Sequence, residues 1–474
     1  MISLVLHAGL ALAAPSYAID APRPLGLWLS TELGAGFVGG DVVSGAALGA
    51  GFETAPFALH LQIPLTLRLF DLPPSVSPAL PSSCRLLRCE EWSEAGELSP
   101  DALARGVDEL RVFRPGAPVH VRGGRLFATL GRGQHVARYT NAAEWDRRGA
   151  GLYLEGNAAW GRTKLEAMLG RLLSPQDLIA ARVSSSPFAP AAGADDVARF
   201  LGRLRLGLEA AADAHAPLAE GSADASSAVD VHGALLPGSE SRPIAGGAFD
   251  VGWLLLDDSD GAGVQVEPWL SVSAMSGLLE RPEPEGGNAG VGGGGSAGLE
   301  VTVDAVFVAA RLSARGTLNG ARHRSAVFTT LYDVDRKRAL LRTGDYARTG
   351  TAQLAAPGGA GGGGALEVVV LRTVRAGARV HIDSLTEASE LEGFAEFAAG
   401  SVDIGVRALQ RSLRSPADAL AFGERTFVVA EAAWSLWAPL SLYFRYRHAP
   451  RFGGAGLAAD DDVVAGASLN VVLQ

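Results

Sequence analysis

The chain has 474 residues, a net charge of −10 and 48% apolar residues, with 60 glycines and only two cysteines. The acidic balance argues against nucleic-acid binding, which requires a clustered basic face. No apolar run approaches the roughly 18 residues of a transmembrane helix. The apolar residues instead lie in short alternating runs from one end of the chain to the other.

The N-terminal residues 1–18 have the features of a secretory signal peptide. An apolar segment spans residues 2–14, and the small-x-small pattern Ser-Tyr-Ala ends at Ala18, the expected cleavage site. The segment lacks the usual Lys or Arg before its apolar core, and a buried N-terminal helix is the alternative. Because Pro15 disfavours that helix, we expect export, with residues 19–474 forming one domain.

Apolar and polar residues alternate along the rest of the chain. A period of two predicts β-strands with one apolar and one polar face. Residues 57–69 keep this alternation longer than an ordinary strand of about five or six residues. Between 299 and 315 the parity switches, which predicts a turn at Asp304-Ala305. The expected strands are 27–35, 42–53, 57–69, 107–114, 121–131, 149–158, 162–171, 179–187, 198–212, 247–257, 264–275, 297–304, 306–315, 365–374, 378–386, 391–398, 402–411, 426–437, 438–452 and 460–474.

The lengths of the connections separate two architectures, a soluble sandwich and a transmembrane barrel. Alternate connections are short, as at 54–56, 159–161 and 399–401, while those between them are long, as at 71–106 and 316–364. Short turns on one rim and long loops on the other are typical of outer-membrane barrels. We therefore predict an all-β, antiparallel up-and-down transmembrane β-barrel with short periplasmic turns and long extracellular loops. Twenty strands fit this pattern, and omitting the two weakest, 107–114 and 297–304, gives about 18.

With these features the chain resembles Gram-negative outer-membrane β-barrels of the porin-like class. Residues 125–183, which begin RLFATLGRGQHVARYTNAAEWD, and TTLYDVDRKRALL at 329–341 are similar to segments of large uncharacterised barrels of social and predatory soil bacteria. The resemblance implies the outer membrane, contact with its lipid and lipopolysaccharide, and insertion by the barrel-assembly machinery. Such barrels commonly end in an aromatic residue, whereas this chain ends Leu473-Gln474, so assembly would depend on other residues of the last strand.

The two cysteines, Cys84 and Cys89, lie in a long polar loop. In an oxidising compartment they are expected to form a disulfide, and two free thiols are the alternative. Their spacing is not a metal signature by itself.

The loop at 131–149 combines aromatic and charged residues. It could fold into the lumen and narrow the pore, where charged side chains tune selectivity; an external loop with its own ion pairs is the alternative. The constriction hypothesis rests on His135, Arg138, Tyr139, Asp146 and Arg147.

Charged residues on the polar faces of the strands are expected to line the pore. Basic and acidic arcs would set up a field across it, and a salt-bridged wall that only stiffens the barrel is an equal alternative. The predicted lining residues are Arg203, Arg205, Glu209, Glu267, Arg311, Arg407, Glu431, Arg445 and Arg447.

Other motifs favour neither catalysis nor ligand binding. Hydrolase and metalloprotease motifs are missing from the sequence, so we expect neither an enzyme nor a cofactor. The acidic runs at 257–261 and 460–462 lack the spacing of a calcium loop. The glycine runs 292–295 and 361–364 lack the frame of a phosphate loop and are predicted to be flexible loops.

The sequence thus predicts a porin-like channel for the passive diffusion of small hydrophilic solutes. An export barrel that works with a periplasmic partner, for example in polysaccharide secretion, is one alternative. A plugged structural or adhesive barrel is another.

Overall fold

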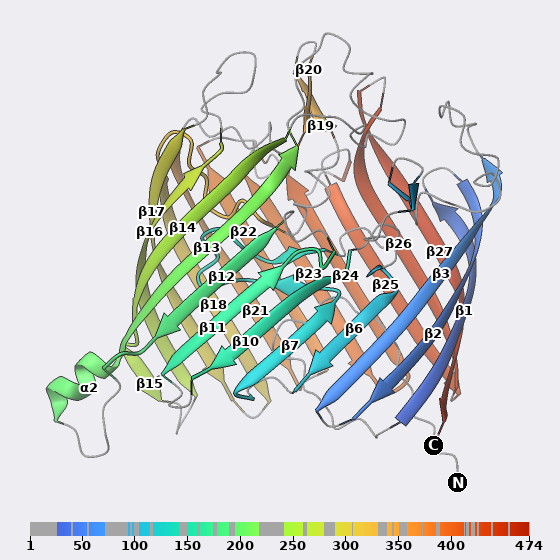
Figure 1. Cartoon of the computed structure of the whole chain (residues 1–474), viewed down its shortest axis with the longest axis horizontal. Helices are drawn as coiled ribbons and strands as arrows, with labels where there is room; N and C mark the ends of the chain where they lie inside the picture. The colour runs from blue at the N-terminus through green and yellow to red at the C-terminus, as the bar shows by residue number, and fades with distance from the viewer. Residues whose placement is uncertain are drawn as a thin grey trace.

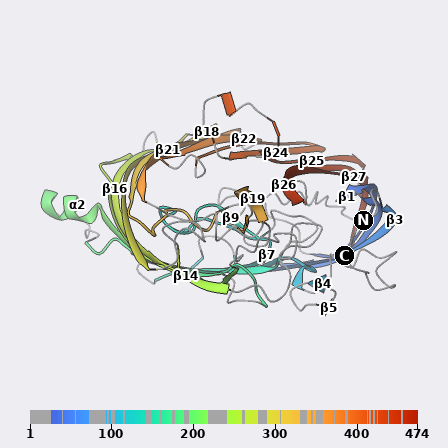
Figure 2. The same ribbon diagram turned by 90° about the horizontal axis from the view of Figure 1, so that it is seen from above.

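Twenty strands form one closed antiparallel barrel in the computed structural model (Figures 1 and 2). The residues it describes are 26–38, 41–54, 56–71, 93–94, 97–98, 104–113, 117–141, 149–158, 162–173, 178–188, 195–217, 241–258, 263–278, 290–305, 307–329, 339–343, 346–349, 358–371, 373–384, 389–411, 413, 417–418, 422–423, 426–437, 439–453 and 456–473. Its wall strands are β1 (Gly26–Val38), β2 (Asp41–Glu53), β3 (Phe57–Asp71), β6 (Val107–Val112), β7 (Val119–Gly124), β10 (Gly151–Asn157), β11 (Thr163–Leu169), β12 (Ile179–Ser185), β13 (Leu204–Pro217), β14 (Ser241–Trp253), β16 (Val264–Ser276), β17 (Val291–Asp304), β18 (Val308–Asn319), β21 (Gly359–Val370), β22 (Val374–Asp383), β23 (Glu390–Ala399), β24 (Val402–Arg411), β25 (Thr426–Trp437), β26 (Leu440–Gly453) and β27 (Gly456–Leu473).

The barrel closes where β1 pairs with β27, from Leu27 opposite Leu473 to Phe37 opposite Val463. Closure removes exposed sheet edges, whose backbone N–H and C=O groups would find no hydrogen-bond partner in lipid. A short strand, β15 (Leu256–Asp258), continues β14 along β16. Within the described ranges, three small hairpins lie apart from the wall sheet: β4 (Ser93–Glu94) with β5 (Glu97–Leu98), β8 (Phe127–Ala128) with β9 (Tyr139–Thr140), and β19 (Ala339–Thr343) with β20 (Tyr346–Thr349).

The predicted fold is confirmed, with the larger strand number. Both strands that seemed weakest from the sequence are present as β6 and β17. The expected strand at 198–212 begins instead with a short helix, α2 (Asp196–Gly202), which the Asp195 side chain caps by accepting from the backbone N–H of Ala198. The turn expected between the strands 365–374 and 378–386 lies at 371–373, so β22 begins earlier than expected.

Both glycine runs are strand rather than flexible loop, which corrects the prediction. Residues 292–295 pair with β16 and residues 361–364 pair with both β18 and β22. Glycine weakens a strand interior, but two paired neighbours satisfy its backbone groups. The side chains that other parts of the chain place beside these glycines are described with the site below.

The outward face of the barrel is apolar. Leu33, Leu208 and Leu270 expose 62%, 61% and 65% of their surface, and the first two are flanked in their strands by an inward glycine and an inward glutamate. Aromatic side chains gather on the outward face near the short-turn rim, among them Phe307, Trp434 and Trp437. An apolar band bordered by aromatic residues is the surface that a bilayer requires. Within the described residues, no helix is long and apolar enough to span a membrane.

The two rims differ as predicted. On one rim the chain turns within a few residues, at 305–307, 371–373 and 400–401, and both termini lie on this side (Figure 1). Its exception is the connection that carries α2, which projects outward from the barrel (Figure 1). The other rim carries most of the long connections. Residues 453–459, expected to connect the last two strands, are mostly strand, because β26 and β27 pair up to Gly453 and Gly456.

One sector of the wall is built from short strands. β6, β7, β10, β11 and β12 have six or seven residues, whereas the other wall strands have at least 10. The chain leaves this low wall after β7 and enters the lumen before β10 begins. That excursion creates the buried core of the molecule.

Candidate functional site

The segment between β7 and β10 folds into the barrel. Its described residues 125–141, hereafter the inward segment, include β8 and β9, and Figure 2 shows β9 within the ring of strands. The expected strand at 121–131 ends at Gly124, whose φ of 91° turns the chain away from the wall. Of the residues predicted for the constriction, His135 and Tyr139 are buried, and Arg138 forms an ion pair with Glu392.

A second segment, residues 320–329, docks on the inward segment. The backbone N–H of Ala137 donates to Phe328 O at 3.0 Å, and Phe328 N–H donates to His135 O at 2.9 Å. Val136 and Phe328 form a parallel β-bridge. The two segments therefore satisfy part of each other's backbone inside the lumen.

Together the two segments bury an apolar core against the part of the wall nearer the long loops. Leu130, Val136, Tyr139 and Phe328 have no exposed surface. They pack against small and flexible lumen-facing residues, namely Met168, Ala180, Ala211, Ile244 and Met275. These wall residues lie in the halves of β11, β12, β13, β14 and β16 nearer the long loops. Burial of about 25 cal/mol per Å² of apolar surface favours the docked position of the inward segment.

Glu209 on β13 fixes the inward segment from the wall. Its Oε1 accepts from the backbone N–H groups of His135 at 3.1 Å and Val136 at 3.3 Å, and its side chain is fully buried. Arg182 lies 3.9 Å from Glu209 and forms two hydrogen bonds to Asp250, at 2.5 and 3.0 Å. The carboxylate therefore holds two donors that would otherwise be buried without a partner.

Arg132 ties the same segment to two further strands. It forms ion pairs with Glu267 on β16 and, at 3.2 Å, with Glu300 on β17. Arg138 forms an ion pair with Glu392 on β23 at 3.3 Å, and its guanidinium lies over the rings of Phe127 and Phe394. The inward segment thus contacts both β16–β17 and β23 across the lumen.

Wall glycines leave the space that inward side chains occupy. A side chain at Gly246 on β14 would meet the ring of His135, and one at Gly294 on β17 would overlap the ring of His323. His323 is also held by Ser273 Oγ at 2.8 Å and Asn319 Oδ1 at 3.0 Å. At Gly294 this explains why a glycine run predicted to be loop is part of the wall.

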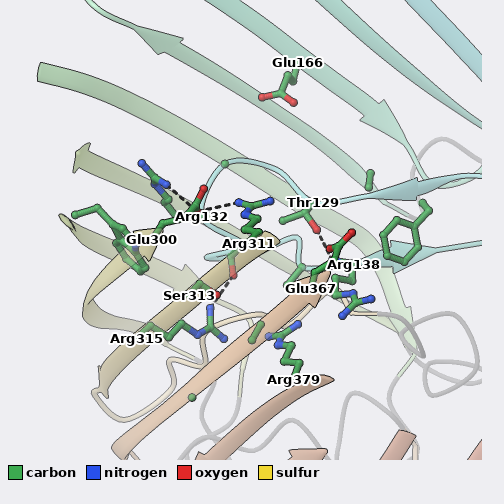
Figure 3. A pocket seen from close by; sticks show the side chains of 18 of the residues that line it. Thr129, Arg132, Arg138, Glu166, Glu300, Arg311, Ser313, Arg315, Glu367 and Arg379 are labelled. Carbon is green, nitrogen blue, oxygen red and sulfur yellow. Dashed lines mark hydrogen bonds and ion pairs between the residues drawn. The ribbon is translucent and has the colours of Figure 1, made fainter. Parts of the chain in front are cut away.

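On the short-turn side of the apolar core lies a cavity of about 480 Å³, which we call the chamber (Figure 3). The inward segment, at residues 127–138, covers the chamber on the side of the apolar core. Its walls come from the halves of the strands nearer the short turns, mainly β7, β10, β11, β18, β21 and β22. Charged side chains dominate it: Arg122, Arg132, Arg138, Lys164, Arg311, Arg315, Arg375 and Arg379 with Glu155, Glu166, Glu300 and Glu367.

The four carboxylates of the chamber are all paired. Lys164 Nζ lies 3.1 Å from both Glu155 and Glu166. Glu300 accepts from Arg132 and, at 2.8 Å, from Arg311, and Glu367 accepts from Arg375 at 2.8 Å. Cations exceed acids in this lining, although Glu267, Glu392 and Glu396 beside it pair with Arg132, Arg138 and Arg375.

Burial lowers the pKa of three groups of the two inward segments. Burial, together with the positive charges of Arg407 and Arg379, lowers the pKa of Arg138 to about 10, although Glu392 opposes the shift. Burial lowers the pKa of His135, and burial with the nearby His135 lowers the pKa of His323 to about 4. Both histidines are therefore neutral near pH 7.

The predicted pore-lining residues occupy four environments, of which three are described first. Arg205, Glu267 and Arg311 lie beside the inward segment, where Arg205 forms an ion pair with Glu267 at 3.0 Å. Glu209 and Arg407 are buried against it, and the Arg407 guanidinium lies over the Phe127 ring. Arg203 ends α2 at the short-turn rim and donates to Leu255 O.

The remaining predicted residues belong to the wall near the closure, hereafter the seam. Arg445 lies 3.6 Å from Glu32 and 3.9 Å from Glu431. Arg447 forms an ion pair with the buried Asp462. Their lipid-facing neighbours Leu442 and Phe444 are about two-fifths exposed, as the alternation predicted, at 40% and 43%.

Several predictions fall outside the described residues. These are the signal peptide at 1–18, the disulfide between Cys84 and Cys89, and the constriction residues Asp146 and Arg147. Among the described residues there is no cluster of three or more His, Cys, Asp or Glu that could hold a metal ion.

Sequence reasoning missed the second inward segment and the arginines opposite it. Residues 320–329 were part of a long external loop in the sequence interpretation, yet His323 and Phe328 are buried. Arg132 and Arg379 were not singled out. The available signal was the pair of wall glycine runs, since a strand without side chains on its polar face leaves room for another segment.

The closed barrel, its apolar belt and its charged lumen define a bacterial outer-membrane β-barrel. No family model and no curated protein matches the sequence. Among solved structures, Wzi, a carbohydrate-binding outer-membrane barrel of Escherichia coli involved in group 1 capsule assembly, is 10% identical over 95% of this chain and 85% of that chain, with a TM-score of 0.34. OpdL of Pseudomonas aeruginosa is 11% identical over 95% and 99%, with a TM-score of 0.34. The ferric enterobactin receptor PfeA of the same organism, as an R480A mutant bound to enterobactin, is 10% identical over 95% and 82%, with a TM-score of 0.37. Likenesses at this level say nothing about function.

Proposed function

We propose that the protein is an outer-membrane channel for the passive diffusion of small hydrophilic solutes, sieved by the inward segment. The observation that carries the proposal is the polar chamber of about 480 Å³ directly beneath that segment. A barrel that served only as a scaffold would gain nothing from a charged, water-accessible cavity, because unpaired charge in the lumen costs stability.

The inward segment supplies the selectivity. It crosses from the low wall at β7 to contacts on β16, β17 and β23, and so restricts the cross-section available to a solute. Charged groups at such a constriction discriminate by size and by field. On this proposal, Arg132 and Arg138 face the passing solute. The buried His135 and Tyr139 hold the inward segment in place behind them.

A plugged barrel that presents its long loops to the outside is the second candidate. The observation that favours it is the apolar core on the long-loop side of the chamber, where Leu130, Tyr139 and Phe328 have no exposed surface. Channel and plug make opposite predictions about conductance, so one measurement separates them. An export barrel with a periplasmic partner finds no specific support among the described contacts.

The proposal also covers the chain's biogenesis. Residues 1–18 direct export and are removed, Cys84 and Cys89 form a disulfide, and the assembly machinery inserts the barrel with its long loops among lipopolysaccharide. No enzymatic activity is assigned. Intact-mass measurement of the purified outer-membrane protein, with and without reduction, tests the cleavage site and the disulfide together.

Planar-bilayer recording of the purified protein tests the channel. We expect small single-channel steps that enlarge when Arg132→Ser removes the ion pairs to Glu267 and Glu300. Arg203→Ser, at the rim, is the matched control and should leave the steps unchanged. A bilayer that shows no steps with either the wild type or Arg132→Ser would establish the plugged barrel instead.

A further inference from the structure

Among the described residues, Arg122, Arg315 and Arg379 of the chamber have no carboxylate partner, and Arg122 is held instead by Phe127 O at 2.7 Å and the Tyr153 ring. The four glutamates of the lining are taken up by Lys164, Arg132, Arg311 and Arg375, as described above. Arg315 donates one Nη to Gly133 O at 3.4 Å, and its other Nη is buried without a partner. Arg379 has no ion pair or hydrogen bond among the residues that the structure describes.

These two side chains converge from opposite sides of one strand. Arg315 lies on β18 and Arg379 on β22, on either side of β21, and their guanidinium groups point toward each other in the chamber (Figure 3). The two outer strands are separated by two strand spacings, about 10 Å, which extended arginine side chains can bridge.

Between the two arginines, the inner face of the middle strand β21 carries only small residues, and Glu367 follows nearer the short turn. Arg315 is opposite Gly363, and Arg379 is opposite Ala365. Both positions line the chamber. The glycine run of β21 therefore forms a trough between two guanidinium groups, and a larger side chain there would fill it.

Two like charges held close together, with no ion pair to an acid, favour the binding of an anion. A planar guanidinium offers paired donors that match the oxygens of a carboxylate or a phosphate, and two of them can grip one oxyanion from both sides. The excess of cations over acids in the lining would also raise the local concentration of anions.

We propose that Arg315 and Arg379 form a binding site for the oxyanion group of a small organic acid or phosphate ester that passes through the chamber. This inference rests on the proposed channel and names the substrate class that it selects. The trough of β21 would admit the anion. The glutamates around it neutralise the other cations of the chamber, so that the bound anion could still dissociate.

The test is block of chloride current in planar bilayers by succinate or by inorganic phosphate, added on the short-turn side. We expect both oxyanions to reduce the current of the wild type, with the lower blocking concentration identifying carboxylate or phosphate as the preferred group. Arg379→Gln and Arg315→Gln should each raise the blocking concentration about tenfold, the effect of losing one charge-assisted contact.

Arg205→Gln is the matched control, because it removes an arginine of the same lumen that is already paired with Glu267. Its blocking concentration should stay within about twofold of the wild type. Retention of the compact band in unboiled gel electrophoresis verifies that each variant is folded. If the channel conducts but oxyanions do not block it, or if Arg379→Gln and Arg205→Gln behave alike, this inference is wrong while the channel stands. Absence of conductance would overturn the channel itself.

Discussion

The two halves of the filled lumen are stabilised in different ways. Nearer the long loops, Tyr139 and Phe328 are completely buried among Met168, Ile244 and other apolar wall residues. Nearer the short turns, the same inward segment is bounded by arginines and glutamates around a cavity of about 480 Å³. One stretch of 17 residues, 125–141, thus has an apolar side and a charged side.

This difference separates the docking of the inward segment from the selection of solutes. Apolar packing is insensitive to salt and fixes where the inward segment lies. Charges in the chamber act on solutes and ions and are screened as the ionic strength rises. We therefore expect substitutions in the apolar half to change how much current passes, and substitutions in the charged half to change which ions carry it.

The largest effect is expected from truncation of the apolar core. Phe328→Ala should weaken docking of the inward segment by about 3–5 kcal/mol and enlarge the single-channel conductance severalfold. Leu442→Ala, on the lipid face, is the control and should leave the conductance unchanged. Equal conductance in the wild type and Phe328→Ala would show that the core does not restrict the pore.

A smaller effect should follow loss of the carboxylate that holds the inward segment. Glu209→Ala leaves the N–H groups of His135 and Val136 without an acceptor, at a cost of about 1–3 kcal/mol. We expect more frequent openings in bilayer records. Glu209→Gln keeps an acceptor oxygen and should lie between Glu209→Ala and the wild type. If Glu209→Gln opened as often as Glu209→Ala, the hydrogen bonds would not be the cause.

Acidification should loosen the docked segments through His323. The docked pKa is about 4 and the ordinary value is 6.5, so the undocked state binds the extra proton between these two values. Docking stability is therefore complete above pH 6.5, falls as the pH is lowered, and levels off below about pH 4. Conductance should rise as pH falls from 7 to 4.5, and His323→Gln should flatten the rise. A conductance that falls over this range would contradict the assignment.

The smallest effect is expected at the seam, where charges face the lumen away from the chamber. Arg445 makes only loose ion pairs, at 3.6 and 3.9 Å, which are worth about 0–1 kcal/mol. Arg445→Gln should therefore change the reversal potential in a salt gradient less than Arg379→Gln does. The reverse order would place the selective site at the seam.

The sequence predicted the wall better than the lumen. Alternation along β26 separates Leu442 and Phe444 from Arg445 and Arg447, because the two faces of a strand meet different solvents. Connection lengths likewise predicted the two rims. These signals are local, and each can be read from one strand at a time.

The filling of the lumen depends on contacts that no single strand reveals. Tyr139 and Phe328 are separated widely in the sequence, yet both belong to one core. Residues 121–131 alternate well enough to suggest a strand, but Gly124 turns the chain inward after β7. The glycine runs suggested flexibility because their backbone partners, and the His323 ring beside Gly294, lie far away along the chain.

The central claim is that solutes pass through a chamber that is open toward the short-turn rim and narrowed above by the inward segment. Its most direct test uses Ser313→Cys, which lines the chamber, in a background with Cys84→Ser and Cys89→Ser. An anionic thiol reagent added on the short-turn side should block the current rapidly, and the same reagent added on the long-loop side should react much more slowly. Equal rates from the two sides, or a current that is unaffected by modification at this position, would contradict the account.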